Sequence, residues 1–236
     1  TRLTGPTNTV AVRGNTGAVF RMEPDGSRIQ ILLQGMRAPF SFDFTPFGDL
    51  WVLSNGEGNP NRLIHAIPGA DYHFQTRPVD WAWLAGKHPL APPVHENPPG
   101  AHTAVVACST LDFPESYTGN LLVSNWGSHG FPSANHVVLR LRLGEQGEVA
   151  ASEPFLETSD PRFRPTQILP APGGGLYVLD WYGQDDENDL TGRLFRISYM
   201  GSEPRIARTG AARAAAAEIW TLRRGGEAGR TDALAR

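Results

Sequence analysis

Three segments of this chain repeat one pattern, in which a turn is followed by a glycine and then by an alternating apolar strand. The segments are FTPFGDLWVLSN (44–55), FPESYTGNLLVSNWG (113–127) and LPAPGGGLYVLDWYG (169–183). Their glycines, Gly48, Gly119 and Gly175, stand at matching places, with intervals that suit four-stranded β-propeller blades carrying loops of uneven length. The repetition therefore predicts an all-β fold made of several similar antiparallel sheets.

A second repeated element pairs apolar residues with an arginine, in VFRMEPDG (19–26), VLRLRLGEQG (138–147) and LFRISYMG (194–201). In the first two, a turn leads into a further apolar segment, which predicts hairpins. The strand at 50–55 is apolar on both faces, as expected for a sheet that lies between two others. At roughly 40–50 residues per blade, residues 1–203 supply about four blades. An ordinary β-sandwich is the alternative.

Composition supports many short strands and excludes several classes of protein. The 236 residues include 26 Gly and 20 Pro, and charged residues make up only 19%. A net charge of −3 gives no basic surface for nucleic acid. The single cysteine, Cys108, excludes an internal disulfide and a cysteine-based metal cluster, and we expect it to be buried. No apolar run is long enough for a transmembrane helix, and no signal peptide pattern is present.

The composition changes near the C-terminus. Residues 204–236 contain an alanine-rich stretch without a strand pattern, which predicts a helical tail. Its sequence is similar to the opening of a HEAT-like helical repeat, which requires several stacked copies. A single terminal helix that docks on the last blade is the alternative.

Several motifs together point to one family. The segment LYVLDWYGQDDENDLTGRLFRI (176–197), with GAVFRMEPDG, QGMRAPFSFDF and IPGADYHF, resembles the propeller of the bacterial glucose/sorbosone dehydrogenases. The subgroup most similar in domain order contains membrane-associated dehydrogenases in which helical repeats follow the propeller. The resemblance implies a six-bladed propeller of which this chain forms part, a periplasmic or otherwise extracytoplasmic location, and the cofactors pyrroloquinoline quinone (PQQ) and calcium. No C-x-x-C-H haem attachment motif occurs in this chain.

The resemblance also implies site residues. The family's cofactor-binding arginine loop corresponds to residues 35–39, which assigns the cofactor contact to Arg37. The family's calcium-binding carbonyls correspond to Gly56 and Glu57. The family's catalytic histidine comes from blades that precede this material, so the resemblance assigns no catalytic base here.

Two further groups of residues are candidates. Asn55, Asn125 and Asp180 follow the three repeated strands at similar places, and a lactonase-like hydrolase would hold a metal ion with such side chains. Trp81 and Trp83 lie in a long proline-rich connector, where they would form a sugar platform or contact a protein partner.

Three functions follow from these observations. The first is a degenerate dehydrogenase-like propeller that serves as a scaffold or accessory subunit with protein partners in a larger extracytoplasmic complex, which the missing base favours. The second is a sugar or alcohol dehydrogenase domain that depends on PQQ and calcium. The third is a lactonase-like metal-dependent hydrolase.

Overall fold

The computed structural model describes residues 2–4, 10–13, 16–45, 48–56, 61–72, 91, 93–108, 112–127, 136–171, 174–182 and 191–206. Fifteen strands are present in this part of the chain, together with one short 3₁₀ turn at Glu115–Tyr117. The strands are β1 (Arg2–Thr4), β2 (Val10–Arg13), β3 (Gly17–Arg21), β4 (Gln30–Met36), β5 (Ala38–Phe44), β6 (Leu50–Asn55), β7 (Asn61–His65), β8 (His95–Asn97), β9 (His102–Ala107), β10 (Leu121–Asn125), β11 (Val137–Leu143), β12 (Val149–Leu156), β13 (Pro165–Pro170), β14 (Leu176–Tyr182) and β15 (Thr191–Ile197).

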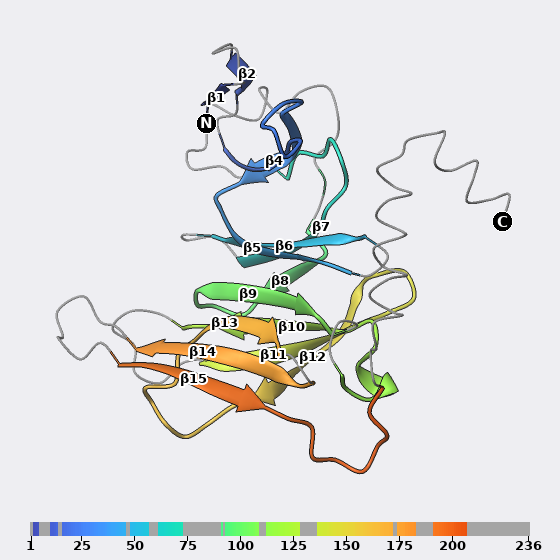
Figure 1. The fold of residues 1–236 in the computed structure, drawn as a ribbon, viewed down its shortest axis with the longest axis vertical. Coiled ribbons are helices and arrows are strands. Elements are labelled where there is room, and N and C mark those ends of the chain that lie inside the picture. The colour runs from blue at the N-terminus through green and yellow to red at the C-terminus, as the bar shows by residue number, and fades with distance from the viewer. Residues whose placement is uncertain are drawn as a thin grey trace, which may run out of the picture.

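The strands form sheets in which consecutive strands are antiparallel neighbours. The orders are β1-β2, β3-β4, β5-β6-β7-β8, β12-β11-β10-β9 and β13-β14-β15. Figure 1 shows the sheets stacked along the long axis, from β3 and β4 in the upper part to β13–β15 at the lower end. A two-sheet sandwich does not contain such a succession of sheets. The predicted all-β, propeller-type architecture is confirmed, as are the hairpins β3-β4 and β11-β12.

Each repeated glycine occupies a backbone conformation that L-residues rarely adopt. The φ angles of Gly48, Gly119 and Gly175 are +83°, +78° and +79°. In the first repeat the Gly48 amide donates to the Thr45 carbonyl oxygen over 2.8 Å, which closes the turn ahead of β6. Glycine is the residue that adopts this left-handed conformation without steric cost, which explains why the same residue opens all three strands.

Apolar side chains fill the space between successive sheets. One core cluster joins β3-β4 to β6 and β7 and includes Leu33, Val52 and Ile64. A second cluster joins β6 and β7 to β9–β11, and a third joins β9–β11 to β13–β15. On β10 the side chains alternate between the second cluster (Leu121) and the third (Leu122). The strands β6 and β10 are therefore buried on both faces, as the sequence predicts for the strand at 50–55.

Polar side chains also connect the first strands of neighbouring sheets. Ser41 Oγ accepts from the Val105 amide over 3.2 Å, and Asp43 Oδ2 accepts from the Ala107 amide over 2.8 Å. Burial raises the pKa of the Asp43 carboxyl, against the effect of the hydrogen bonds that the amides of Ala107 and Phe44 donate to it. Side chains of β5 thus bind the backbone of β9 directly, and this fixes how the two sheets are aligned.

The remaining expectations about the chain are settled only in part. Cys108 is 1% exposed, which confirms a buried thiol. Residues 207–236, which contain most of the expected helical tail and HEAT-like segment, lie outside the described residues. The described residues contain no helix with the length and hydrophobicity to span a membrane.

Candidate functional site

A cavity of about 530 Å³ lies where the ends of β6, β10 and β14 meet the beginnings of β5, β9 and β13. The residues around it come from several sheets, because equivalent strand ends meet on one face of the stack. Three of them were selected from the sequence, namely Arg37, Asn55 and Gly56. Arg37 is the one charged side chain among the described residues that line the cavity.

The three predicted residues reach the cavity from adjoining segments. Arg37 is exposed and links β4 to β5, whereas Asn55 and Gly56 end β6. The Gly56 amide donates to Asn61 Oδ1 over 3.0 Å, which anchors the turn after β6. Asn61 in turn donates to the carbonyl oxygens of Pro98 and Gly100. The structure therefore brings the predicted cofactor contact and one predicted calcium ligand to the same cavity.

The other predicted residues lie elsewhere. Asn125 and Asp180 do not line the cavity, although Asn125 ends β10 and Asp180 lies two residues before the end of β14. Glu57, Trp81 and Trp83 lie outside the described residues, so their roles stay predictions.

Each strand-end polar side chain binds protein atoms. Asn55 donates through Nδ2 to the His102 carbonyl oxygen and accepts through Oδ1 from the His102 amide, both over 2.9 Å. Asn125 donates to the Pro99 carbonyl oxygen over 3.1 Å and accepts from the Gly127 amide over 3.0 Å. These bonds connect the strand ends to neighbouring loops. Among the described residues, no group of three or more His, Cys, Asp or Glu side chains is placed to hold a metal ion.

Asp180 belongs to an ion-pair network at the end of β14. Its carboxylate accepts from Arg193 Nε over 2.6 Å and from the Arg164 amide over 2.5 Å. Arg193 also binds Asp160 over 2.6 Å, which contributes most to lowering the pKa of that carboxyl to about 2. The network joins the strand end to the loop that precedes β13, and so fixes the backbone on one side of the cavity.

Two tryptophans form an aromatic wall that was not selected from the sequence. Trp126 Nε1 donates to the Trp181 carbonyl oxygen over 3.0 Å, and the two ring centroids are 6.2 Å apart. The Arg164 guanidinium lies 4.4 Å from the Trp126 ring centroid and donates to the Trp126 carbonyl oxygen. A signal was present in the sequence, since Trp126 directly follows Asn125 and Trp181 directly follows Asp180.

His102 lies in sequence between two residues that line the cavity, Ala101 and Thr103, and braces a loop. It is completely buried, and Nε2 lies 2.8 Å from the Pro98 carbonyl oxygen. Because a carbonyl oxygen only accepts, Nε2 carries the proton in the neutral ring. Burial is the main reason that the pKa of His102 is lowered from 6.5 to about 4. The hydrogen bond to Pro98 raises this pKa, and the nearby His95 lowers it. His102 is therefore neutral near pH 7, and its hydrogen bond braces the loop that carries Pro98.

The low pKa of His102 predicts acid sensitivity. The unfolded chain binds the proton at the ordinary pKa of 6.5 and the folded chain only near 4, so stability is complete above pH 6.5 and falls as the pH drops toward 4. Linkage gives a loss of about 2 kcal/mol in the free energy of unfolding between pH 7.5 and pH 5. Urea denaturation of the wild type and of His102→Gln at pH 7.5 and at pH 5 measures this loss. An equal loss in the variant, which cannot titrate at this position, would contradict the assignment.

Solved structures that share this fold are known. The chain is similar to a glucose dehydrogenase crystal structure, with a TM-score of 0.53 and 20% identity over 75% of this chain and 49% of that one. It is also similar to the PQQ-bound aldose sugar dehydrogenase of Streptomyces coelicolor, with a TM-score of 0.54 and 17% identity over 75% of this chain and 50% of that one. The chain therefore spans about half the length of these structures, and the likeness establishes the propeller fold.

Comparisons of sequence identify a family without an assigned activity. No curated protein matches this chain. The family model described as "Domain of unknown function (DUF7133)" matches residues 6–197, which is most of the chain and includes all the residues described around the cavity. The chain belongs to the DUF7133 family, with a β-propeller fold shared with sugar dehydrogenases.

Proposed function

We propose that this chain forms part of the cofactor-binding face of a quinone-dependent dehydrogenase, and that its cavity binds PQQ. The observation that carries the proposal is the meeting of Arg37, Asn55 and Gly56 in one cavity beside the Trp126–Trp181 wall. The resemblance to glucose/sorbosone dehydrogenases selected Arg37 and Gly56 from the sequence alone, whereas Asn55 was selected because it follows one of the repeated strands. An extracytoplasmic location and the membrane-associated subgroup with helical repeats belong to the same proposal.

The cavity has the chemistry that PQQ requires. PQQ is planar, aromatic and carries carboxylates, so its site needs a cation and flat apolar surfaces. Arg37 supplies the cation, because guanidinium groups bind carboxylates with charge-assisted hydrogen bonds. Trp126 and Trp181 supply aromatic surface, and Thr103 and Thr166 add hydroxyl groups at the lining. The volume of about 530 Å³ lies within the range typical of small-molecule and cofactor sites.

The cavity fits a calcium ion less completely than it fits PQQ. Backbone carbonyl oxygens suit this hard cation, and the proposal assigns those of Gly56 and Glu57. Gly56 lines the cavity, but the Asn55 amide oxygen beside it already accepts from the His102 amide. Calcium binding therefore rests on the turn after β6 and on the resemblance.

The roles of the residues follow from their positions. A bound quinone would accept the hydrogen and electrons of an alcohol or sugar substrate. Arg37 would orient the cofactor through a carboxylate, and the tryptophan wall would exclude water from its plane. The described lining residues include no histidine or carboxylate that would serve as the base. That observation favours a second candidate, the degenerate propeller that acts as a scaffold or accessory subunit for protein partners.

The lactonase-like hydrolase finds less support in the geometry. That function would place Asn55, Asn125 and Asp180 around one cation, but only Asn55 lines the cavity. The hydrogen bonds of all three to protein atoms give each a structural role. The hypothesis stays a prediction of the sequence.

Binding of PQQ to the purified protein tests the proposal. Titration followed by tryptophan fluorescence, with calcium and then with EDTA, is expected to show saturable binding. Arg37→Ala should weaken it about 10- to 100-fold, since a hydrogen bond to a charged group contributes roughly 1.5–3 kcal/mol. Arg142→Ala, an exposed arginine of β11 away from the cavity, is the matched control and should bind like the wild type.

The outcomes separate the two candidates. Binding together with dye reduction by an aldose supports a dehydrogenase domain, whereas binding without dye reduction supports a propeller that retains the site but not the catalysis. Absence of PQQ binding in the wild type would contradict the proposal and leave the accessory role.

A further inference from the structure

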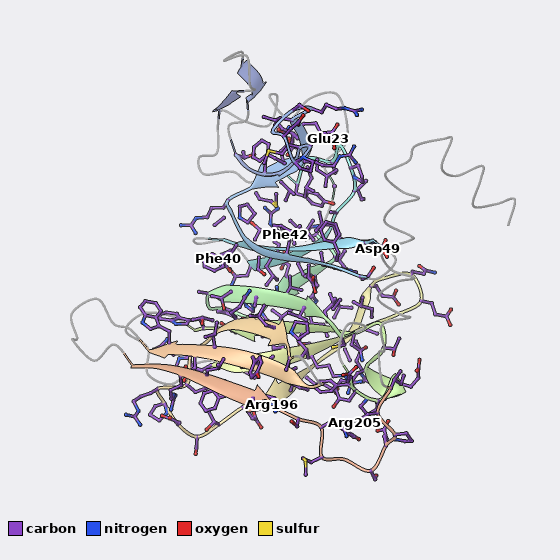
Figure 2. All side chains as sticks on the ribbon, viewed as in Figure 1. Glu23, Phe40, Phe42, Asp49, Arg196 and Arg205 are labelled. Carbon is purple, nitrogen blue, oxygen red and sulfur yellow. The ribbon has the colours of Figure 1, made fainter. Side chains whose placement is uncertain are left out.

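Several contacts hold the turn between β4 and β5 that carries Arg37. The Arg37 side chain is exposed, whereas the two residues before it, Gly35 and Met36, are buried. Met36 belongs to the core cluster that joins β3-β4 to β6 and β7. Figure 2 labels Phe40, a cavity residue three positions after Arg37, and Asp49, which lies toward the opposite end of the same sheet. The turn therefore lies at the cavity end of the β5–β8 sheet.

Gly35 is bound on both sides of its backbone. Its amide donates to Thr16 Oγ1 over 2.9 Å, and its carbonyl oxygen accepts from Arg62 Nη2 over 3.1 Å. Its φ of +85° is a conformation that glycine adopts without steric cost. The two partners come from other parts of the chain, since Thr16 precedes β3 and Arg62 lies on β7. Two separate segments thus fix the backbone two residues before Arg37.

The Arg62 guanidinium joins two segments at once. Besides its bond to Gly35, it donates through Nη1 to the Tyr72 carbonyl oxygen over 2.5 Å. Residues 69–72 run beside β4, because the Tyr72 amide donates to the Gln34 carbonyl oxygen over 2.9 Å. Arg62 therefore closes the end of this pair of segments and ties both of them to β7.

The chemistry of Arg62 favours these bonds. Its side chain is partly buried, and burial lowers its pKa, whereas the Glu96 carboxylate on the neighbouring strand β8 raises it. A guanidinium remains charged at neutral pH, and a charge removed from water is costly unless it is hydrogen-bonded. Hydrogen bonds from a charged donor also contribute more to stability than those between neutral groups. We therefore expect Arg62 to keep both carbonyl oxygens bound.

Gly17, the first residue of β3, packs closely against the same turn. A Cβ at this position would lie 2.5 Å from Pro39 Cδ, 2.8 Å from the Met36 carbonyl oxygen and 3.1 Å from the Arg37 carbonyl oxygen. Atoms on both sides of Arg37 in the sequence therefore contact the start of β3. The backbone of the turn has little room to move toward β3.

We propose that Arg62 and Thr16 are positioning residues for Arg37, which they hold where it binds a carboxylate of the cofactor. The inference rests on the proposed function, because it gives both residues a part in binding the same ligand. Neither of them lines the cavity, so each acts through the Gly35 backbone. An arginine on an ordered turn loses less conformational freedom when the ligand binds, which strengthens binding.

Titration of variants with PQQ, followed by tryptophan fluorescence, tests the inference. Arg62→Gln and Thr16→Val should each raise the dissociation constant about two- to tenfold, which is the range expected when one long side chain must be ordered on binding. Circular dichroism and thermal melting verify that both variants are folded. Binding as tight as in the wild type for both folded variants would overturn the inference.

Matched controls remove the same kinds of bond far from the Arg37 turn. Arg140→Gln removes a bond from a guanidinium to the Ser116 carbonyl oxygen, and Thr45→Val removes a bond from the Asp49 amide to a threonine hydroxyl. Ser116 precedes β10 and Asp49 precedes β6, whose opposite ends meet the cavity. Both controls should bind PQQ like the wild type. A similar loss of binding in the controls would assign the effect to general destabilisation and overturn the inference.

A double-mutant cycle shows whether Arg62 acts through Arg37. In the Arg37→Ala background, Arg62→Gln should change the dissociation constant by less than about twofold, because no guanidinium is left to position. A residue with a structural role alone would weaken binding by the same factor in both backgrounds. Equal factors would therefore contradict the positioning role.

Hydrogen exchange at the Gly35 amide gives a measure that does not depend on PQQ. Arg62→Gln should increase the exchange rate of this amide at least about tenfold, because the turn opens more often, whereas Arg140→Gln should leave the rate unchanged. If the wild type does not bind PQQ, the proposed function fails, and this rate decides whether Arg62 holds the turn. An unchanged rate in Arg62→Gln would overturn the inference even where PQQ binds.

Discussion

Replacing Gly175 by alanine is expected to lower the free energy of unfolding by about 3–4 kcal/mol. Two costs add at this position. The φ of +79° imposes about 1–2 kcal/mol on any L-residue. An alanine Cβ would also lie 2.3 Å from the Ile197 carbonyl oxygen of the neighbouring strand, which forces the backbone apart. Such overpacking typically costs another 1–3 kcal/mol.

Gly119→Ala provides the matched control within the same repeat. Gly119 has a φ of +78°, but nothing lies within 4 Å of where its Cβ would be. This variant should therefore lose only the conformational part, about 1–2 kcal/mol. Urea denaturation of both variants at pH 7.5 measures the two losses. Equal losses would show that the β14-β15 pair accommodates the methyl group, contrary to expectation.

Replacing Asp180 by asparagine is expected to lower the free energy of unfolding by about 3 kcal/mol. The Asp180 side chain is 1% exposed, and its charge faces the Arg193 guanidinium at 2.5 Å. Asparagine keeps an oxygen for the Arg164 amide but turns an NH₂ group toward the donors of Arg193. Removing one partner of a buried pair typically costs 3–5 kcal/mol, and the 33% exposure of Arg193 places this case at the lower end.

Asp160→Asn is the corresponding control, because it removes the other carboxylate bound to Arg193. The Asp160 side chain is 28% exposed, so solvent screens its pair and the expected loss is smaller than in Asp180→Asn. The same denaturation series compares the two variants. A larger loss in Asp160→Asn than in Asp180→Asn would show that burial of Asp180 does not control the strength of this network.

The sequence predicts the parts of the fold that depend on patterns within a few adjacent residues. Alternation and turn glycines identify β6, β10 and β14, because a strand's side-chain period and a left-handed turn are properties of a few adjacent residues. β8 was not predicted, because its residues lie in a proline-rich connector and its strand pairs Asn97 with the distant Asn61. The exposure of Leu179 on β14 and of Leu194 on β15 could not be predicted either, since an apolar strand has the same pattern whether or not a sheet covers it.

The candidate site likewise contains residues that the sequence predicts and residues that it does not. Arg37, Asn55 and Gly56 were selected because each lies at a recognisable strand end or turn, and the structure places all three around one cavity. Trp126 was missed because its position depends on Arg164, 38 residues later in the chain, whose guanidinium covers the ring. Contacts of that kind arise only when successive sheets stack.

The buried sulfur of Cys108 has a practical consequence. It lies in the core cluster between β9–β11 and β13–β15, and it is the only cysteine in the chain. A thiol reagent therefore modifies a single defined site, and reaches it only when those two sheets separate. The modification rate under native conditions reports how often this seam opens, in the way that amide exchange reports local unfolding.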